Sequence, residues 1–218
     1  MAHNMTYNEA IEINNHGIRL YERLRYEEAR NMFTLALDIL RDAMVEQTEK
    51  QSPEYEELSD ALLLWGDSRE ESNPSTATNC SSFIFQSAIV IVPMRRHSHL
   101  YGKESAAIVY NLGLVQHMMG VKMNSTVHLK QAVSFYTISC SIQHSSKVCD
   151  EPLLRMALLN NLGQIHVEFS DFRNAVLCFQ RLSDELERSR ETFLLADTDC
   201  KGFLYNILLQ EPSVAGAA

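Results

Sequence analysis

The chain has 218 residues, of which 45% are hydrophobic and 22% are charged, so it can bury a core in one extended or two small domains. The 28 acidic and 19 basic side chains give a formal net charge of −9, which argues against a broad phosphate-binding face and against nucleic acid as a general partner. The five cysteines form no CxxC pair, a pattern expected of reduced thiols.

Residues 6–47 are predicted to form an antiparallel pair of helices. Arg25-Tyr26 supplies a short turn between two stretches with helical hydrophobic spacing. In the second stretch, the small side chains of Ala29 and Ala36 allow the helices to approach closely, and Phe33 fills the space between them. Such a hairpin cannot bury all its apolar surface alone, so we expect it to pack on further hairpins.

Residues 55–94 are predicted to form a degenerate helical hairpin that is interrupted by a flexible loop at 67–80, which is polar and contains a proline. Segment 83–92 is rich in β-forming residues, and a strand is therefore a serious alternative there. Phe85 and Ala88, with a following proline, nevertheless keep the order of a repeat's second helix. The choice between helix and strand stays open at this stage.

Residues 103–145 are predicted to form the next helical hairpin, with a longer turn whose extra residues bulge at one edge. Residues 152–189 are expected to form the last complete hairpin. A single helix at 199–210 would cap the open end of the stack, and the tail at 211–218 should be frayed.

A short phrase recurs in the first helix of each clear hairpin: Asn14-Asn15-His16-Gly17, Tyr110-Asn111-Leu112-Gly113 and Asn160-Asn161-Leu162-Gly163. After the first and third glycines, an alanine and then an aromatic residue follow at the same distances, at Ala29 and Phe33 and at Ala175 and Phe179. Such internal similarity is typical of stacked structural repeats.

This pattern resembles the tetratricopeptide repeat, a helix–turn–helix unit of about 34 residues. The long helices and loops are similar to the extended repeats of kinesin light chains. The resemblance implies an all-α fold, with antiparallel helical hairpins stacked as a right-handed solenoid in a single domain over 1–210. It also implies that the first helices line a concave groove, which in this family holds a peptide from a partner.

Asn15, Asn111, Asn161 and Asn206 occupy the same place in successive first helices. Because an amide side chain both donates and accepts hydrogen bonds, such a row can hold a peptide backbone whatever its sequence. The same groove is expected to be lined by three further residues: Leu114, Met118 and Gln164. The alternative is that these asparagines bond only to adjacent backbone or to one another and support the stack.

Other candidate sites are weaker. Arg95-Arg96-His97-Ser98-His99 could bind an acidic or phosphorylated segment, but a solvated loop is the simpler interpretation. Ser68 and Ser72 resemble sites of acid-directed kinases. Cys178 near His166 has no third group to make a thiol nucleophile, and no catalytic, metal-binding or cofactor-binding signature appears.

We therefore expect a scaffold or adaptor that binds a protein or peptide partner, and neither an enzyme nor a protein with a cofactor, metal or small-molecule substrate. The alternative is a structural subunit packed permanently in a larger assembly, with its groove filled by another subunit or by its own 67–80 loop. The polar first residues and the lack of a long apolar run predict a soluble protein of the cytoplasm or nucleus, with no membrane insertion.

Overall fold

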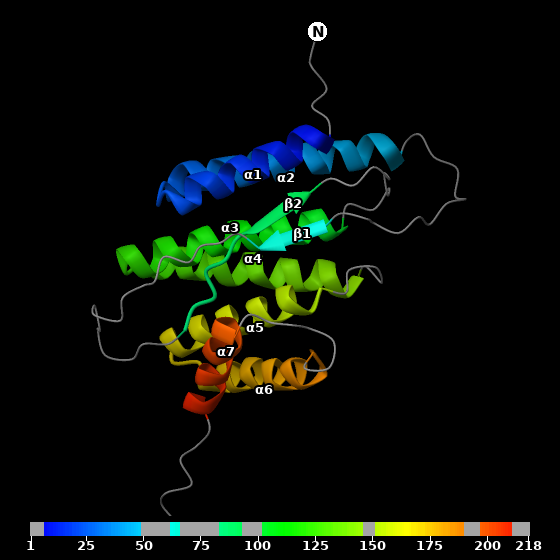
Figure 1. Cartoon of the computed structure of the whole chain (residues 1–218). Coiled ribbons are helices and arrows are strands. Elements are labelled where there is room, and N and C mark those ends of the chain that lie inside the picture. The colour runs from blue at the N-terminus through cyan, green and yellow to red at the C-terminus, as the bar shows by residue number, and fades with distance from the viewer. Residues whose placement is uncertain are drawn as a thin grey trace, which may run out of the picture. The chain divides into compact units, whose positions relative to one another are not determined.

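The computed structural model describes residues 7–48, 62–65, 83–92, 102–145, 151–189 and 197–210. Helices account for most of this part of the chain, accompanied by two short strands (Figure 1). The elements are α1 (Tyr7–Glu22), α2 (Tyr26–Thr48), β1 (Leu62–Trp65), β2 (Ile89–Val92), α3 (Gly102–Met123), α4 (Thr126–Ser145), α5 (Pro152–Glu168), α6 (Phe172–Ser189) and α7 (Asp197–Gln210).

The chain divides into two compact units. The first contains α1 to α4 and both strands, and the second contains α5 to α7 together with residues 83–86. Within the units, α1 packs on α2, α3 on α4 and α5 on α6, in the ranges where the sequence predicted hairpins. Helix α7 packs on α5 and α6 and covers the range predicted for the capping helix.

All three hairpins use the same turn. A residue with positive φ ends the first helix of each pair: Leu24 (59°), Asn124 (50°) and Ser170 (57°). The next residue then donates its N–H to the carbonyl five positions back, as from Arg25 to Leu20 (3.0 Å) and from Asp171 to His166 (2.8 Å). This left-handed helix end satisfies carbonyls that a helix otherwise leaves unpaired.

The prediction of a longer, bulged turn near Gly120 is wrong. Helix α3 continues to Met123 and α4 begins at Thr126, so the extra residues are helical and do not bulge. They lengthen both helices by about one turn, and the contact between Gly113 and Tyr136 is kept.

Three of the repeated glycines are sites of close helix packing. A Cβ atom added at Gly17, Gly113 or Gly163 would lie 2.7 Å from an aromatic ring of the second helix in the same hairpin. The rings belong to Phe33, Tyr136 and Phe179. The recurring glycine and the aromatic residue that follows it therefore form one contact, which sets how closely the two helices approach.

A buried ion pair also joins the two helices of the last hairpin. Arg155 of α5 donates its Nε–H to Oε1 of Glu185 on α6 at 2.9 Å. Glu185 is only 4% exposed, and its other oxygen lies 2.7 Å from the guanidinium of Arg188. The carboxylate of Glu185 thus pairs with one arginine of α5 and one of its own helix, and the bond from Arg155 joins α5 to α6.

The prediction of a degenerate helical hairpin over 55–94 is wrong for the residues of this range that the structure describes, 62–65 and 83–92. Residues 83–88 form neither helix nor strand, and β2 pairs antiparallel with β1, with Leu62 opposite Val92 and Trp65 opposite Ile89. Four consecutive β-branched residues in β2 disfavour a helix. The fold is thus mostly helical with a small two-stranded sheet.

Several predicted features lie outside the described residues. They are the 67–80 loop with Ser68 and Ser72, the basic cluster at 95–99 and the tail at 211–218.

Replacing Gly163 by alanine tests the close packing. An alanine in a helix interior normally stabilises by about 1 kcal/mol relative to glycine. Here its Cβ would meet ring atoms of Phe179 at 2.7 to 3.0 Å. We expect Gly163→Ala to lower the free energy of unfolding by about 1–2 kcal/mol in urea titrations, as overpacking does.

Leucine at position 179 is smaller than phenylalanine and leaves room for the added Cβ atom. The alanine should therefore cost less unfolding free energy in Gly163→Ala/Phe179→Leu, compared with Phe179→Leu alone, than it does in the parent chain. A gain in stability for Gly163→Ala by itself would contradict the packing described.

Candidate functional site

In the first unit, two asparagine side chains hold the backbone of β2. Oδ1 of Asn15 accepts the N–H of Ile91 at 3.1 Å, and its Nδ2 donates to the Ile91 carbonyl at 2.8 Å. Asn111 binds Ile89 in the same way: its Oδ1 accepts the N–H at 2.8 Å, and its Nδ2 donates to the carbonyl at 2.9 Å. Each amide therefore binds both backbone groups of one residue, as a neighbouring peptide group would.

Asn14 links these two amides. Its Nδ2 donates to Oδ1 of Asn15 at 3.0 Å and to the Ile89 carbonyl at 3.4 Å, and its Oδ1 accepts from Nδ2 of Asn111 at 3.1 Å. We call Asn14, Asn15 and Asn111 the first clamp. The links fix the orientation of each amide, because a flipped amide would place like groups against one another.

The second unit contains the same arrangement. Asn161 binds both backbone groups of Phe85, at 2.9 Å each, and Asn206 binds those of Phe83 at 2.9 and 2.7 Å. Asn160 donates to Oδ1 of Asn161 (3.1 Å) and to the Phe83 carbonyl (3.0 Å), and accepts from Asn206 (2.7 Å). Asn160, Asn161 and Asn206 form the second clamp, which repeats the first contact by contact.

The repeated phrase explains why there are two clamps. An Asn-Asn pair lies on α1 and again on α5, and a single asparagine comes from α3 or α7. On α3 the residue before Asn111 is Tyr110, whose hydroxyl donates to the Ser87 carbonyl at 3.2 Å. The chain between the two clamped pairs is thus also held through its backbone.

The clamps satisfy groups that would otherwise be buried without partners. Both asparagines of the second Asn-Asn pair, and Asn14, Asn111 and Asn206, are 0% exposed. A buried amide is costly unless its hydrogen bonds are made, and so is a buried backbone N–H. Because the first clamp binds Ile89 and Ile91, the backbone groups of Val90 and Val92 face β1.

Three of the four clamped residues have side chains packed in the core, and Phe83 is half-buried. Phe85 is 1% exposed, and Ile89 and Ile91 are 0% exposed. Phe83 lies against Gly202 and, with Phe85, contacts the ring of Phe203. The backbone is therefore held by amides, while the side chains fill apolar space.

Each of the four asparagines predicted from the sequence contacts the extended segment, two in each clamp. Sequence reasoning missed Asn14 and Asn160, although the Asn-Asn pairs were visible in the repeated phrase. Its structural alternative placed another subunit or the 67–80 loop in the groove; that loop lies outside the described residues, and the clamps hold residues of segment 83–91. Leu114 and Gln164 are buried and Met118 is half-buried, and these three take no part in the clamp hydrogen bonds.

Cys178 and His166, the thiol and imidazole considered in the sequence, are both half-buried. Burial raises the pKa of Cys178 to about 11, so the thiol is protonated at neutral pH. His166 lies 3.1 Å from a carboxylate oxygen of Asp171. No group of three or more His, Cys, Asp or Glu side chains is placed to hold a metal ion within the described parts of the chain.

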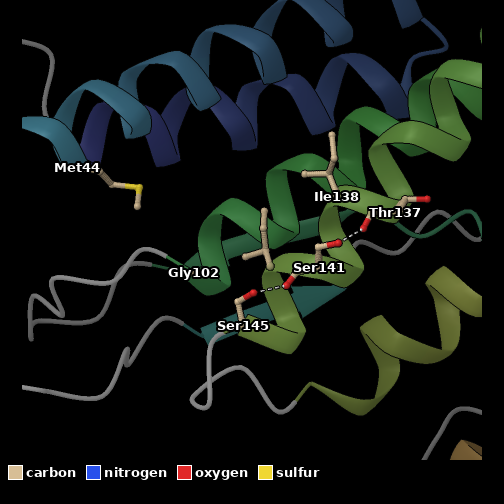
Figure 2. Close-up of a pocket in the computed structure, with 7 residues that line it drawn as sticks. Met44, Gly102, Thr137, Ile138, Ser141 and Ser145 are labelled. Carbon is tan, nitrogen blue, oxygen red and sulfur yellow. Dashed lines mark hydrogen bonds between the residues drawn. The ribbon is translucent and has the colours of Figure 1, made fainter.

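An apolar hollow of about 460 Å³ lies in the first unit (Figure 2). It is lined by residues of α2, α3 and α4: Met44, Gly102, Thr137, Ile138, Ser141, Ile142 and Ser145. The hydroxyls of Ser141 and Ser145 donate to carbonyls of their own helix, at 3.0 and 2.9 Å. None of the clamp residues lines it.

Asn111→Ala tests the first clamp. The change leaves the buried N–H of Ile89 without its acceptor, so we expect a loss of about 2–3 kcal/mol in the free energy of unfolding. Hydrogen exchange should accelerate at Ile89 and Ile91. Asn31→Ala is the matched control, because Asn31 is an exposed helical asparagine of the same unit. Equal effects of the two variants would contradict a special role for Asn111.

His117 gives a pH test of the first unit. Burial lowers its pKa to about 4, and its Nδ1 lies 3.4 Å from the Tyr136 hydroxyl. Below about pH 6.5 the unfolded chain takes up a proton that the folded chain does not, until the folded chain also does so near pH 4. Stability should therefore fall by about 3 kcal/mol across this window as pH decreases.

Urea titrations of the parent and of His117→Phe, which cannot titrate, isolate this contribution as the difference between the two pH profiles. His144→Gln, at an exposed position, is the control and should follow the parent. Parallel profiles for parent and His117→Phe would show that His117 titrates normally.

No helix in the described residues is long and apolar enough to cross a membrane. Comparison with protein-family models, with curated proteins and with solved structures found no match to this chain.

Proposed function

We propose that this protein is an interaction scaffold or adaptor that binds an extended segment of a partner protein through its asparagine clamps. The proposal rests on one observation: four asparagine amides each bind both the backbone N–H and the backbone C=O of a single residue, at 2.7 to 3.1 Å. They belong to Asn15, Asn111, Asn161 and Asn206. The resemblance of the hairpins to tetratricopeptide repeats supports the same function.

Bonding of this kind suits recognition of a partner. The amides contact only backbone N–H and C=O groups, so they supply affinity without requiring a particular sequence. The contacts replace those of a neighbouring β-strand, and an extended segment from another chain could make all of them. Side-chain packing beside each clamp would then decide which segments fit.

The chain's own segment is a competitor for any partner. A tethered segment acts at an effective concentration in the millimolar range, so a partner must bind more tightly or use additional surface. The alternative function is structural: the segment stays in place permanently and the module is part of a larger assembly. The complete burial of Ile89 and Ile91 favours this alternative.

Complementation with a synthetic peptide tests the proposal. Residues 83–92 of the full chain are replaced by Gly and Ser, and a soluble peptide carrying the sequence of 83–92 is added. We expect saturable binding and a rise in Tm on adding the peptide, because ligands that bind only the folded state stabilise it. Asn15→Ala/Asn161→Ala in the same background should abolish both effects.

If the replaced chain retains its helices by circular dichroism and binds no peptide, the proposal is wrong. Should the replaced chain fail to fold, Ile89→Pro in the otherwise unchanged chain weakens the internal segment through loss of one N–H and serves in its place. In the unmodified chain, amides of 89–91 that exchange as slowly as those of α3 would support the structural alternative.

A further inference from the structure

We infer that the second clamp is selective for an aromatic pair: it binds an extended partner segment that carries aromatic side chains at positions i and i+2 and proline at neither. The inference rests on the proposed function and adds the chemical class of the segment. The chain's own Phe83 and Phe85 occupy these two positions and show how such a segment fits.

Three aromatic rings form a cluster beside the second clamp. Phe203 of α7 is 0% exposed and stacks on Phe85, with ring centroids 5.4 Å apart and planes inclined by 26°. It meets Phe83 edge to face at 5.8 Å, and Phe83 and Phe85 lie 6.5 Å apart at 71°. These offset and edge-on geometries are the ones that aromatic rings prefer, and aliphatic side chains cannot reproduce them.

Gly202 leaves the space that the Phe83 ring occupies. A Cβ atom at this position would lie 2.5 Å from three atoms of the Phe83 ring. The ring at position i can occupy its place only because residue 202 has no side chain. Gly202 and Phe203 are adjacent on α7, so one turn of helix shapes the surroundings of both rings.

The first clamp makes the same amide contacts to the backbone of residues with different side chains. It holds Ile89 and Ile91, and the strand they belong to also pairs with β1. Identical backbone bonding with different side chains places the selectivity in the packing beside the amides.

The clamp also excludes some residues. Asn161 and Asn206 each accept a backbone N–H through Oδ1, which proline lacks. Phe85 at position i+2 is 1% exposed, so a charged residue there would lose its hydration. The segment should therefore be uncharged at i+2.

Peptide binding to the full chain with Phe83→Ala/Phe85→Ala tests this selectivity, because the internal segment is then weakened. The first probe is a fluorescent peptide with the sequence of 81–88, Ser-Ser-Phe-Ile-Phe-Gln-Ser-Ala. The second has isoleucine in place of both phenylalanines, and the third is N-methylated at the second phenylalanine. We expect the first to bind about tenfold or more tightly than the second, and the third to lose binding.

Gly202→Ala in the same chain is the specificity control. It should weaken binding of the phenylalanine peptide and leave the affinity for the isoleucine peptide nearly unchanged. Equal affinity for the two peptides would overturn the inference while leaving the proposed function in place. Binding of neither peptide, together with failure of complementation by 83–92, would instead remove the proposed function.

Hydrogen exchange on the wild-type chain keeps the inference testable if the double variant does not fold. Gly202→Ala should accelerate hydrogen exchange at residues 83–86 and leave it unchanged at 89–91. An equal change at the two segments would contradict the role of Gly202. A dimer seen by light scattering in wild type but lost in Phe83→Ala/Phe85→Ala would identify a second copy as the occupant and overturn the assignment to a partner protein.

Discussion

The described structure depends on one requirement: an extended backbone buried against helices must find partners for its N–H and C=O groups. A helix offers none from its own backbone, since its hydrogen bonds are made internally. Side-chain amides on the first helices of the hairpins and on α7 supply them here. Asn15 and Asn111 do so for β2, and Asn161 and Asn206 for residues 83–85. Without these amides the segment could not be buried at so low a cost.

Hairpin packing places the amides at the required spacing. Gly17, Gly113 and Gly163 let an aromatic ring of the second helix lie directly on the first. In each case an asparagine precedes the glycine by two residues and therefore lies on a different side of the helix. The glycine faces the partner helix while the asparagine faces the segment. A single short phrase thus specifies both the packing of a hairpin and the contact it makes with an extended chain.

The helical part of the fold was predictable because its determinants are local. Periodic apolar residues and the spacing from glycine to aromatic residue defined the helices, and the row of asparagines indicated backbone binding. The occupant was not predictable, because Ile91 and Asn15 meet only through long-range packing. The extra turn in α3 and α4 was misread for a related reason: lengthening by whole turns keeps the same face in contact, which a count of residues cannot distinguish from a bulge.

The pairing of β2 has a consequence for solubility. Ile-Val-Ile-Val is a short, uncharged run of strong β-formers with no proline, the type of sequence that assembles into cross-β aggregates when its edges are open. One edge is covered by β1 and the other by the first clamp, so the asparagines protect the strand as capping strands do elsewhere. Any event that frees this segment, including binding of a partner, also exposes an unpaired strand edge that can pair with another chain.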